Sequence, residues 1–331
     1  MKVAIIGCGL IGQKRACALG AAELAVACDA VPERAAALAR TVKNCTAAVN
    51  WQEVVTFPSI DIVIVATTHD LLAPIAAAAA ANAKHVLIEK PGGRAAAELD
   101  CVAQSAARTG ALVRVGFNHR YHRALRKARE VFDSGVLGPL MFIRGRYGHG
   151  GRIGYDKEWR SRPEISGGGE LIDQGMHLID LARWFLGDFV KVRGSIGTYF
   201  WDMPVEDNGF LLLETAQGQT AFLHASCTEW KNLFSLEIYG RNGKLEINGL
   251  GGSYGTERLA HYQMLPQMGP PPTTIWQYPM ADDSWQSEFQ EFLEDIRLGR
   301  QPDPGIAAAQ TSLRVVETIY ARAEKRLSCA S

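Results

Sequence analysis

The chain has 331 residues, enough for two domains of ordinary size, and 47% of them are hydrophobic and 21% charged, as in globular proteins with a substantial core. Its 35 basic and 35 acidic residues cancel, which excludes the broad positive field that nucleic acid or an anionic membrane surface requires. The 7 cysteines form no CxxC pair, which argues against both a disulfide framework and a zinc site.

The N-terminal segment MKVAIIGCGLIG superficially resembles a signal peptide, because one lysine precedes an apolar run. The run is short, interrupted by glycines and followed directly by Lys14 and Arg15, so a nucleotide-binding first strand explains it better. The alanine-rich stretch 73–83 is too short to span a bilayer. We therefore expect a cytoplasmic protein with neither a membrane partner nor a nucleic-acid partner.

The first third of the chain alternates short apolar runs with helical stretches, which is the pattern of a parallel sheet with helices on both faces. Strands are predicted at 3–6, 24–28, 62–65, 85–88 and 113–115, and helices at 13–19, 32–40, 72–81 and 95–109. This alternation predicts one doubly wound Rossmann domain of the α/β class over residues 1–119.

After Phe117 the pattern changes to strands that several times end in glycine-containing turns, which is typical of antiparallel connections. Helices are predicted at 122–134 and 170–186, and strands at 140–146, 191–199, 209–214, 220–226, 234–240 and 244–248. Residues 265–274 are rich in proline and glycine and are expected to form a loop. Terminal helices at 284–298 and 305–327 are expected to cover the sheet or to return to the first domain. Residues 120–331 are thus predicted to form an α+β domain for substrate binding and oligomerisation, with a largely antiparallel sheet.

A glycine pattern lies between the first strand and the first helix. Gly7, Gly9 and Gly12 form GxGxxG, which provides a tight turn, close backbone approach to a pyrophosphate and close packing of helix on strand. Asp29 ends the second strand, where a carboxylate binds the ribose hydroxyls of NAD and repels a 2′-phosphate. Arg34 could soften that preference, although such a residue more often lies on a solvated helix face. The pattern predicts NAD as the cofactor.

Two further clusters carry groups suited to proton chemistry. Lys90 follows the strand 85–88 at the carboxyl edge of the sheet, where open α/β sheets bind ligands, although a solvated charge pair at a strand end is an equal alternative. Asp173 and His177 are spaced i,i+4 on a predicted helix and would share a face. Histidine is the natural proton carrier for carbinol–carbonyl exchange near neutral pH. A lone His/Asp pair is more often structural, so the clusters indicate function only together with the glycine turn.

The order of these motifs resembles the glucose-fructose oxidoreductase / inositol dehydrogenase / MocA family over the whole chain. The segments that carry the resemblance are GCGLIG at 7–12, Asp29, EKP at 89–91, GFNHRY at 116–121 and DxGxH at 173–177. It implies a Rossmann domain followed by an α/β domain with an open, mostly antiparallel sheet. It also implies an NAD(H)-dependent dehydrogenase or reductase that moves a hydride to or from a carbinol carbon of a sugar, nucleotide sugar or inositol-like polyol.

The resemblance also implies roles for individual residues. Lys90, Asp173 and His177 would form the catalytic set: His177 exchanges the proton of the substrate hydroxyl, Lys90 hydrogen-bonds the same oxygen, and Asp173 orients a neighbouring hydroxyl. The cofactor contacts that it implies are Gly7, Gly9, Leu10, Ile11, Gly12, Asp29, Thr67, His69, Glu89, Lys90 and Asn118. One departure is visible, because the family pattern ATPNxxH reads ATTHDLL at 66–72 here.

The loop 146–166 is rich in aromatic and arginine side chains, which suit sugar rings, carboxylates and phosphates. The predicted substrate contacts are Lys90, Arg120, Tyr155, Trp159, Arg160, Asp173 and His177. A long loop that packs its aromatic rings on the sheet is the alternative. The arginines favour an anionic or nucleotide-linked sugar slightly over a free polyol.

Other functions remain open at this stage. A non-catalytic NAD- or sugar-sensing regulator on the same fold is the main alternative, although such relatives tend to lose the lysine or the histidine. Reduction of an imine or a diol rather than a sugar ketone, and a redox-neutral step with bound NAD, are further alternatives. No metal is expected, because HxH, HExxH and CxxC spacings are missing from the sequence. The resemblance also implies a homodimer or homotetramer.

Overall fold

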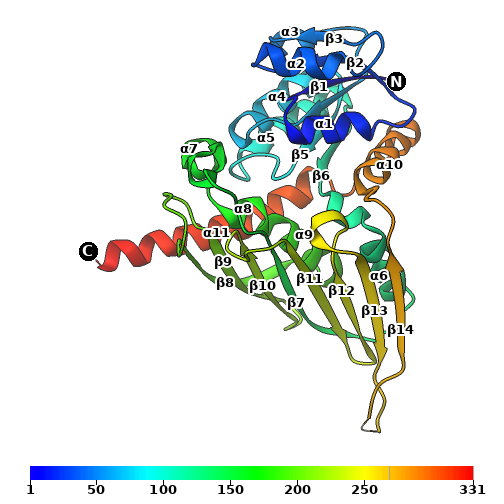
Figure 1. Cartoon of the computed structure of the whole chain (residues 1–331), viewed down its shortest axis with the longest axis vertical. Helices are drawn as coiled ribbons and strands as arrows, with labels where there is room; N and C mark the ends of the chain where they lie inside the picture. Colours follow the sequence, from blue (N-terminus) through cyan, green and yellow to red (C-terminus); the bar gives the residue numbers. More distant parts are fainter. Residues whose placement is uncertain (268, 331) are drawn as a thin grey trace. The chain divides into compact units, whose positions relative to one another are not determined.

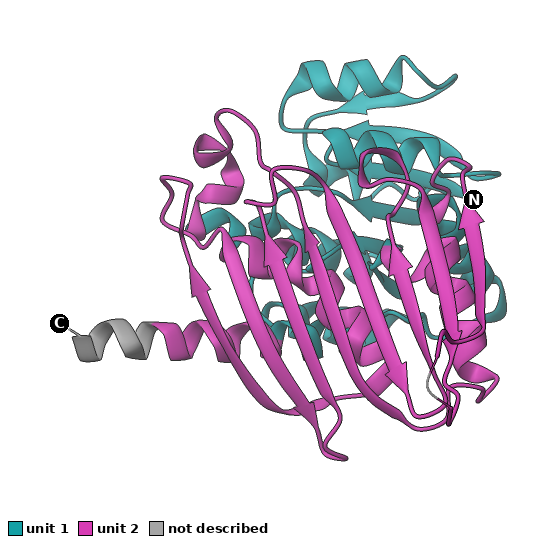
Figure 2. Ribbon diagram, turned by 60° about the horizontal axis from the view of Figure 1, so that its bottom comes forward, with its two compact units in different colours: residues 1–118, 164–167, 285–313 teal, residues 119–163, 168–284, 314–331 magenta. Residues whose placement is uncertain are grey.

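The computed structural model describes residues 1–267 and 269–330, with side chains given outside 324–330, and it divides into two compact units. Figure 2 colours the two units. Unit 1 consists of Met1–Asn118, Glu164–Gly167 and Trp285–Leu313. Unit 2 consists of His119–Pro163, Gly168–Ser284 and the chain from Arg314 onward. Each unit is therefore built from chain segments that lie far apart in the sequence.

Unit 1 contains a six-stranded parallel sheet whose strand order is β3-β2-β1-β4-β5-β6 (Figure 1). Its strands are β1 (Lys2–Ile6), β2 (Glu23–Cys28), β3 (Thr46–Ala48), β4 (Ile62–Val65), β5 (His85–Glu89) and β6 (Val113–Gly116). This order is that of the Rossmann fold and confirms the predicted fold class. The prediction missed β3, because this short edge strand is largely exposed and lacks an apolar run.

Most helices of unit 1 lie between these strands in sequence. They are α1 (Leu10–Cys17), α2 (Pro32–Ala39), α3 (Trp51–Val54), α4 (His69–Ala81), α5 (Glu98–Thr109) and, from the far end of the chain, α10 (Ser284–Leu298). On α10, Phe289 and Phe292 are fully buried in one core cluster with Val3 and Ile5 of β1. Burial of these rings holds the distant helix on the sheet, because each ring removes a large apolar area from water.

Two buried ion pairs also attach α10 to the sheet. Arg15 is fully buried on α1 and donates to Glu288 over 2.6 Å, and Arg114 on β6 donates to Asp295. Removing one partner of such a pair strands an uncompensated charge in the interior, so these pairs specify where α10 packs.

Unit 2 contains an eight-stranded sheet whose strand order is β14-β13-β12-β11-β7-β10-β9-β8 (Figure 1). Its strands are β7 (Leu140–Gly148), β8 (Phe189–Gly197), β9 (Asn208–Thr215), β10 (Thr220–Ser226), β11 (Leu233–Gly240), β12 (Gly243–Asn248), β13 (Glu257–Gln263) and β14 (Thr273–Tyr278). All neighbours are antiparallel except β7 and β10, which confirms the predicted open, mostly antiparallel sheet. The prediction missed β13 and β14, and β14 begins inside the stretch 265–274 that was expected to be a loop. Residue 268 of that stretch lies outside the described residues.

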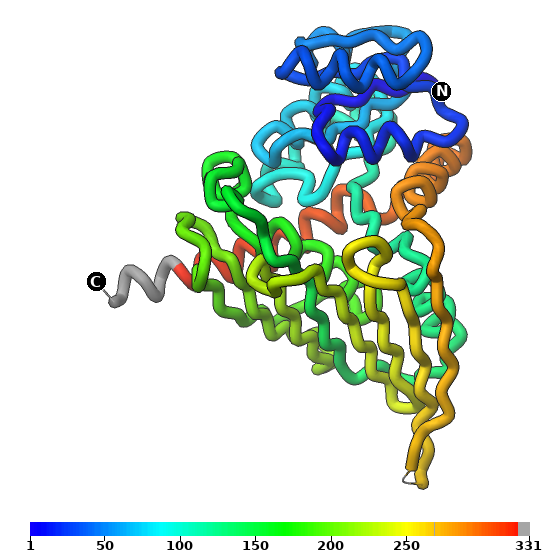
Figure 3. Tube along the Cα trace, in the orientation of Figure 1, coloured from blue at the N-terminus to red at the C-terminus, as the bar shows by residue number. Residues whose placement is uncertain are grey.

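The helical segments of unit 2 include the one that carries the predicted catalytic pair. They are η1 (Asn118–Tyr121), α6 (Arg123–Asp133), η2 (Tyr155–Lys157), η3 (Trp159–Ser161), α7 (Pro163–Ser166), α8 (Glu170–Asp173), α9 (Gly175–Leu186), η4 (Gly252–Tyr254) and α11 (Ile306–Ala330), of which η1, α7 and α11 extend across a unit boundary. Figure 3 follows the chain to the red helix α11. The predicted single helix 170–186 was wrong in its continuity, because it is interrupted at Gln174. There the His177 amide bonds to the Gln174 carbonyl, and Gly175, a poor helix former, begins the next helix.

Three further observations concern the described part of the chain. Cys8, Cys17, Cys28, Cys45, Cys101 and Cys227 are free thiols, whereas the side chain of Cys329 lies outside the described residues. Among the described residues, no helix is both long and apolar enough to cross a bilayer. The same residues contain no cluster of three His, Cys, Asp or Glu side chains that could hold a metal ion.

Candidate functional site

The glycine turn of unit 1 has the shape that a pyrophosphate requires. Gly7 has a φ of +98°, and a Cβ there would meet the Ala66 carbonyl oxygen at 2.4 Å. A Cβ at Gly12 would meet the Gly7 carbonyl oxygen at 1.9 Å. A Cβ at Gly9, by contrast, would meet nothing within 4 Å. The outer glycines are therefore required by the fold, whereas the middle one leaves open space at the N-terminus of α1, where backbone N–H groups bind phosphate.

Asp29 stands beside this turn at the end of β2. Its carboxylate accepts hydrogen bonds from the backbone N–H of Cys8 over 2.7 Å and of Val31 over 2.9 Å. Burial, assisted by Asp29, raises the pKa of the Cys8 thiol to about 12, so the turn carries no thiolate beside the phosphate position. A carboxylate held at this place fits the ribose hydroxyls of NAD. Turn and carboxylate together fit the cofactor that the sequence predicted.

Leu10 and Ile11 begin α1, and Thr67 and His69 lie between β4 and the first turn of α4. Leu10 is exposed on the helix N-terminus, whereas His69 is buried and its Nδ1 lies 2.7 Å from the carbonyl oxygen of Ser166. His69 thereby anchors the segment 164–167 to unit 1. Contacts of these residues with NAD stay predictions.

Glu89 and Lys90 lie where β5 ends, at the carboxyl edge of the sheet. Glu89 is buried and accepts a hydrogen bond from Nε of Arg15 over 2.6 Å, so its carboxylate is paired with a buried arginine of unit 1. Lys90 is half-buried at the next position. Asn118 is buried at the last position of unit 1, after β6. The structure therefore places Lys90 and Asn118 at the strand ends where ligands bind in such sheets, and their contacts stay predictions.

Unit 2 brings Asp173 and His177 onto consecutive helices, and both are buried. Asp173 accepts a hydrogen bond from Nε of Arg160 over 2.8 Å. Burial acts to lower the pKa of Arg160, but Asp173, Tyr155 and Glu158 together outweigh it, and the net shift is upward. The predicted catalytic carboxylate is thus held by a guanidinium from the predicted substrate loop. Such a charge-assisted bond is stronger than a neutral one.

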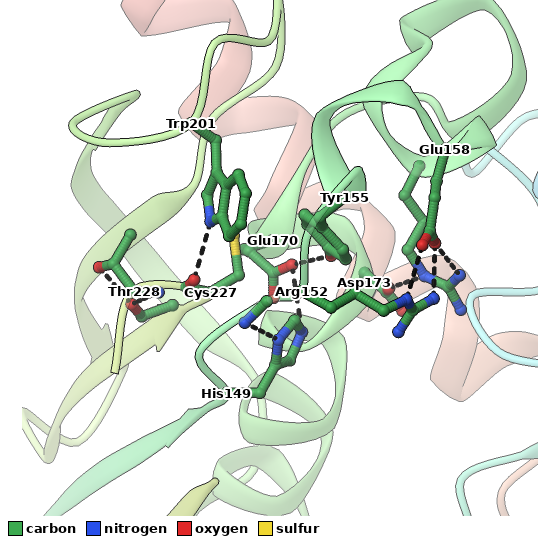
Figure 4. A network of polar contacts seen from close by, with 12 residues as sticks. His149, Arg152, Tyr155, Glu158, Glu170, Asp173, Trp201, Cys227 and Thr228 are labelled. Carbon is green, nitrogen blue, oxygen red and sulfur yellow. Dashed lines mark hydrogen bonds and ion pairs between the residues drawn. The ribbon is translucent and has the colours of Figure 1, made fainter. Parts of the chain in front are cut away.

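The arginines and aromatic rings of the loop form a polar network (Figure 4). Arg152 binds Glu158 through two hydrogen bonds of 2.7 Å. Tyr155 and Glu170 are both buried, and the Tyr155 hydroxyl donates a hydrogen bond to the Glu170 carboxylate. Burial, and secondly the charge of Glu170, raise the pKa of Tyr155, so its hydroxyl keeps its proton. Nε2 of His149 lies 3.6 Å from the same carboxylate. Glu170 therefore holds two side chains of the loop onto α8.

The other predicted substrate contacts are Arg120 and Trp159. Arg120 is buried and binds Asp180 of α9 through hydrogen bonds of 2.8 and 2.6 Å. The guanidinium of Arg160 lies 4.5 Å from the centre of the Trp159 ring, a cation–π contact. Arg120 and Tyr155 thus have partners within unit 2, and substrate contacts of all these residues stay predictions.

Sequence reasoning missed Glu170 and His119. Glu170 was read only as the start of a helix, although it follows three glycines that point to a crowded site. His119 lies inside the GFNHRY segment, but its neighbours Asn118 and Arg120 were chosen instead. Its ring stacks on His177, and no spacing in the sequence indicates that contact.

Comparisons with known proteins support the fold described above. Residues 1–117 match a model described as oxidoreductase family, NAD-binding Rossmann fold, and residues 125–246 match the GFO/IDH/MocA C-terminal domain. Levoglucosan dehydrogenase of Pseudarthrobacter phenanthrenivorans is 29% identical over 66% of this chain, and the match spans only 59% of that relative. The scyllo-inositol 2-dehydrogenase (NAD(+)) of Bacillus subtilis is 25% identical over 91% of this chain and 88% of its own length. A structure of levoglucosan dehydrogenase with NADH and levoglucosan has a TM-score of 0.88 at 23% identity, covering 98% of this chain and 97% of the other, which shows a shared fold.

Proposed function

Because this chain belongs to the glucose-fructose oxidoreductase / inositol dehydrogenase / MocA family of NAD-binding oxidoreductases, we propose that it transfers a hydride between NAD and a carbinol or ketone carbon of a sugar or polyol. The observation that carries this proposal is the buried pair of Asp173 and His177 on consecutive helices, with Arg160 bound to the carboxylate. A sensor would need to bind the sugar, but it would not need a buried proton acceptor beside a fixed carboxylate.

The mechanism assigns one task to each residue. NAD, when bound, accepts the hydride from the carbinol carbon. His177 takes the proton of the reacting hydroxyl during oxidation and returns it to the carbonyl oxygen during reduction. Lys90 hydrogen-bonds that oxygen and stabilises the negative charge that develops on it. Asp173 orients a neighbouring hydroxyl, and Arg160 keeps the carboxylate in place.

The charges of two of the four arginines in the loop 146–166 are neutralised within unit 2, which favours an uncharged substrate. Arg152 and Arg160 each bind a carboxylate of the same unit, Glu158 and Asp173 respectively. A third carboxylate, Glu170, is buried among them. Paired arginines give little attraction for an added anion, whereas fixed carboxylates accept hydrogen bonds from hydroxyl groups. A free sugar or polyol is therefore preferred here over the anionic or nucleotide-linked sugar that the arginine count alone favoured.

The test is reduction of NAD⁺, followed by absorbance of the reduced nicotinamide, over a panel of inositols, free aldoses and nucleotide sugars. We expect turnover with an uncharged member and its loss in His177→Ala. The Arg152→Gln variant is the matched control, because it removes an exposed charge from the same loop and should keep turnover. Binding of NAD and a sugar without turnover across the panel would overturn the enzymatic proposal and favour a sensor.

We also propose that the protein is a homodimer or homotetramer that associates through the outer face of the eight-stranded sheet. Leu212 and Phe222 face each other across β9 and β10 and are 46% and 48% exposed. Next to them, on the same face, His224 stacks on Phe210 at 4.3 Å between ring centres. Exposed apolar neighbours of this kind indicate a contact surface. We expect Phe222→Glu to lower the mass measured by light scattering, and an unchanged mass would refute this face.

We further propose a cytoplasmic location, which the free cysteines support.

A further inference from the structure

The histidine His119 has no role in the mechanism above, yet its ring lies directly on the predicted base. The ring centres of His119 and His177 are 3.6 Å apart, and the ring planes differ by 26°. Both residues are buried, with 5% and 4% of their surfaces exposed. His119 comes from η1 and His177 from α9, so the contact joins two separate elements. Rings at this distance are in van der Waals contact over their faces.

Other rings enclose this pair and restrict its movement. Tyr147 on β7 stands edge-on to both rings, with ring centres 4.9 Å from His119 and 5.9 Å from His177. Phe234 on β11 packs against His119 at 5.9 Å and against Tyr147 at 5.7 Å. A turn of the His177 ring out of this plane would break its face contact with His119 and change its edge contact with Tyr147.

The titratable groups around the stack come from each neighbouring element. Burial, then Tyr254 on η4, then Asp173 and Glu170 raise the pKa of Tyr147, so this ring stays neutral. His122 also makes an edge contact with His119, with ring centres 5.4 Å apart. Nδ1 of His122 lies 3.4 Å from the buried carboxylate of Glu257 on β13 and 3.8 Å from Asp282.

The electrostatic consequence concerns how many protons the stack can carry. Two imidazolium rings face to face at this distance, away from water, repel each other strongly. A positive charge on His119 therefore makes it harder to protonate His177, and the two rings titrate as a coupled pair.

From this geometry we propose that His119 is a positioning residue for His177: it fixes the plane of the base and competes for its proton, so that His177 stays a neutral acceptor to lower pH. The inference rests on the proposed function. It requires no proton transfer between the rings, because stacked faces offer no hydrogen bond.

Two substitutions separate the two parts of the proposal. His119→Phe keeps a stacked ring but removes both nitrogens, and His119→Ala removes the ring. We expect His119→Ala to lower kcat by about tenfold or more, with the Kd for NAD unchanged, because the base loses its fixed plane. We expect His119→Phe to keep kcat within about threefold above pH 8, and to move the midpoint of the acid limb of kcat upward by about half a pH unit or more. His261→Ala is the matched control, because it removes another buried histidine ring of unit 2, from β13.

A second readout does not depend on turnover. The ring resonance of His177, identified by its loss in His177→Gln, is titrated by NMR in the unmodified protein and in His119→Phe. We expect the midpoint to lie higher in the variant. Equal midpoints, together with superimposable pH profiles, would overturn the proposal. Failure of every sugar to reduce NAD⁺ would instead refute the proposed function, and the NMR titration would still decide the coupling of the two rings.

Discussion

Replacing Glu288 by glutamine tests the buried charge cluster that attaches α10 to unit 1. Glu288 and Glu89 share one buried guanidinium, that of Arg15, so two carboxylates compete for a single cation. Burial raises the pKa of Glu288 from its ordinary value of 4.5 to about 6, Arg15 opposes the shift, and Glu89 adds to it. Oε1 of Glu288 makes no hydrogen bond with the described residues, so a proton can be added there without breaking the bond to Arg15.

The sign of the effect follows from the raised pKa. Between about pH 4.5 and 6 the folded protein holds a proton that the unfolded chain has released, so the folded state is favoured at low pH and this contribution is lost as the pH rises through 6. A shift of this size makes the free energy of unfolding about 1 kcal/mol larger near pH 5 than near pH 7.5. Glu288→Gln cannot titrate and should lack this difference.

The assay is denaturant unfolding of the unmodified protein and of Glu288→Gln at pH 5 and pH 7.5, followed by tryptophan fluorescence. For each protein the change in the free energy of unfolding between the two pH values is measured, and the two changes are compared. Glu294→Gln on the same helix is the control. Hydrogen bonding from Arg297 lowers the pKa of the exposed Glu294, so any contribution has the opposite sign and is weakened by solvent. Parallel pH dependences in Glu288→Gln and the unmodified protein would show that Glu288 does not titrate in this range, and the reasoning would be wrong.

Three further predictions concern the site. Lys90→Ala should lower turnover by about 10²-fold with little change in the Kd for NAD, and near-normal turnover would remove Lys90 from the catalytic set. Gly9→Ala should fold with an unchanged Tm but bind NAD more weakly, because the added Cβ meets no protein atom and occupies the space of the pyrophosphate. Gly12→Ala should lower both Tm and NAD affinity. Equal effects of the two substitutions would contradict the assigned roles of the glycines. Arg160→Met should lower kcat/KM by about tenfold, because it removes the guanidinium from Asp173, the carboxylate that orients the substrate. Arg152→Met should change kcat/KM little. Similar kcat/KM values for the two variants would argue that Arg160 does not hold Asp173 in place.

Much of unit 1 could be predicted from local sequence. Buried parallel strands are continuous apolar runs, and the glycines of the first turn have a fixed spacing, so both can be recognised without tertiary information. The short edge strand β3 could not, because its exposed residues carry no apolar pattern. In unit 2 the strands with alternating burial were found, whereas β14, which is almost wholly exposed, was missed.

The candidate site divides in the same way. The four-residue spacing of Asp173 and His177 and the position of Lys90 at a strand end are visible in the sequence, whereas the break between α8 and α9 that separates the pair is not. The partners of these residues are not visible. Arg160 binds Asp173 from a neighbouring loop. The ion pairs Arg15–Glu288 and Arg120–Asp180 join residues that lie far apart in the chain.

The sequence alone therefore determined the class of fold and the cofactor, because the alternation of strands and helices and the glycine turn are short-range patterns. Only the tertiary structure decided which charges are neutralised, which aromatic hydroxyls are already bonded and which ring lies on His177. Hydrogen bonds and ring contacts depend on a few ångströms between side chains brought together from separate elements, and residue spacing along the chain does not specify those distances.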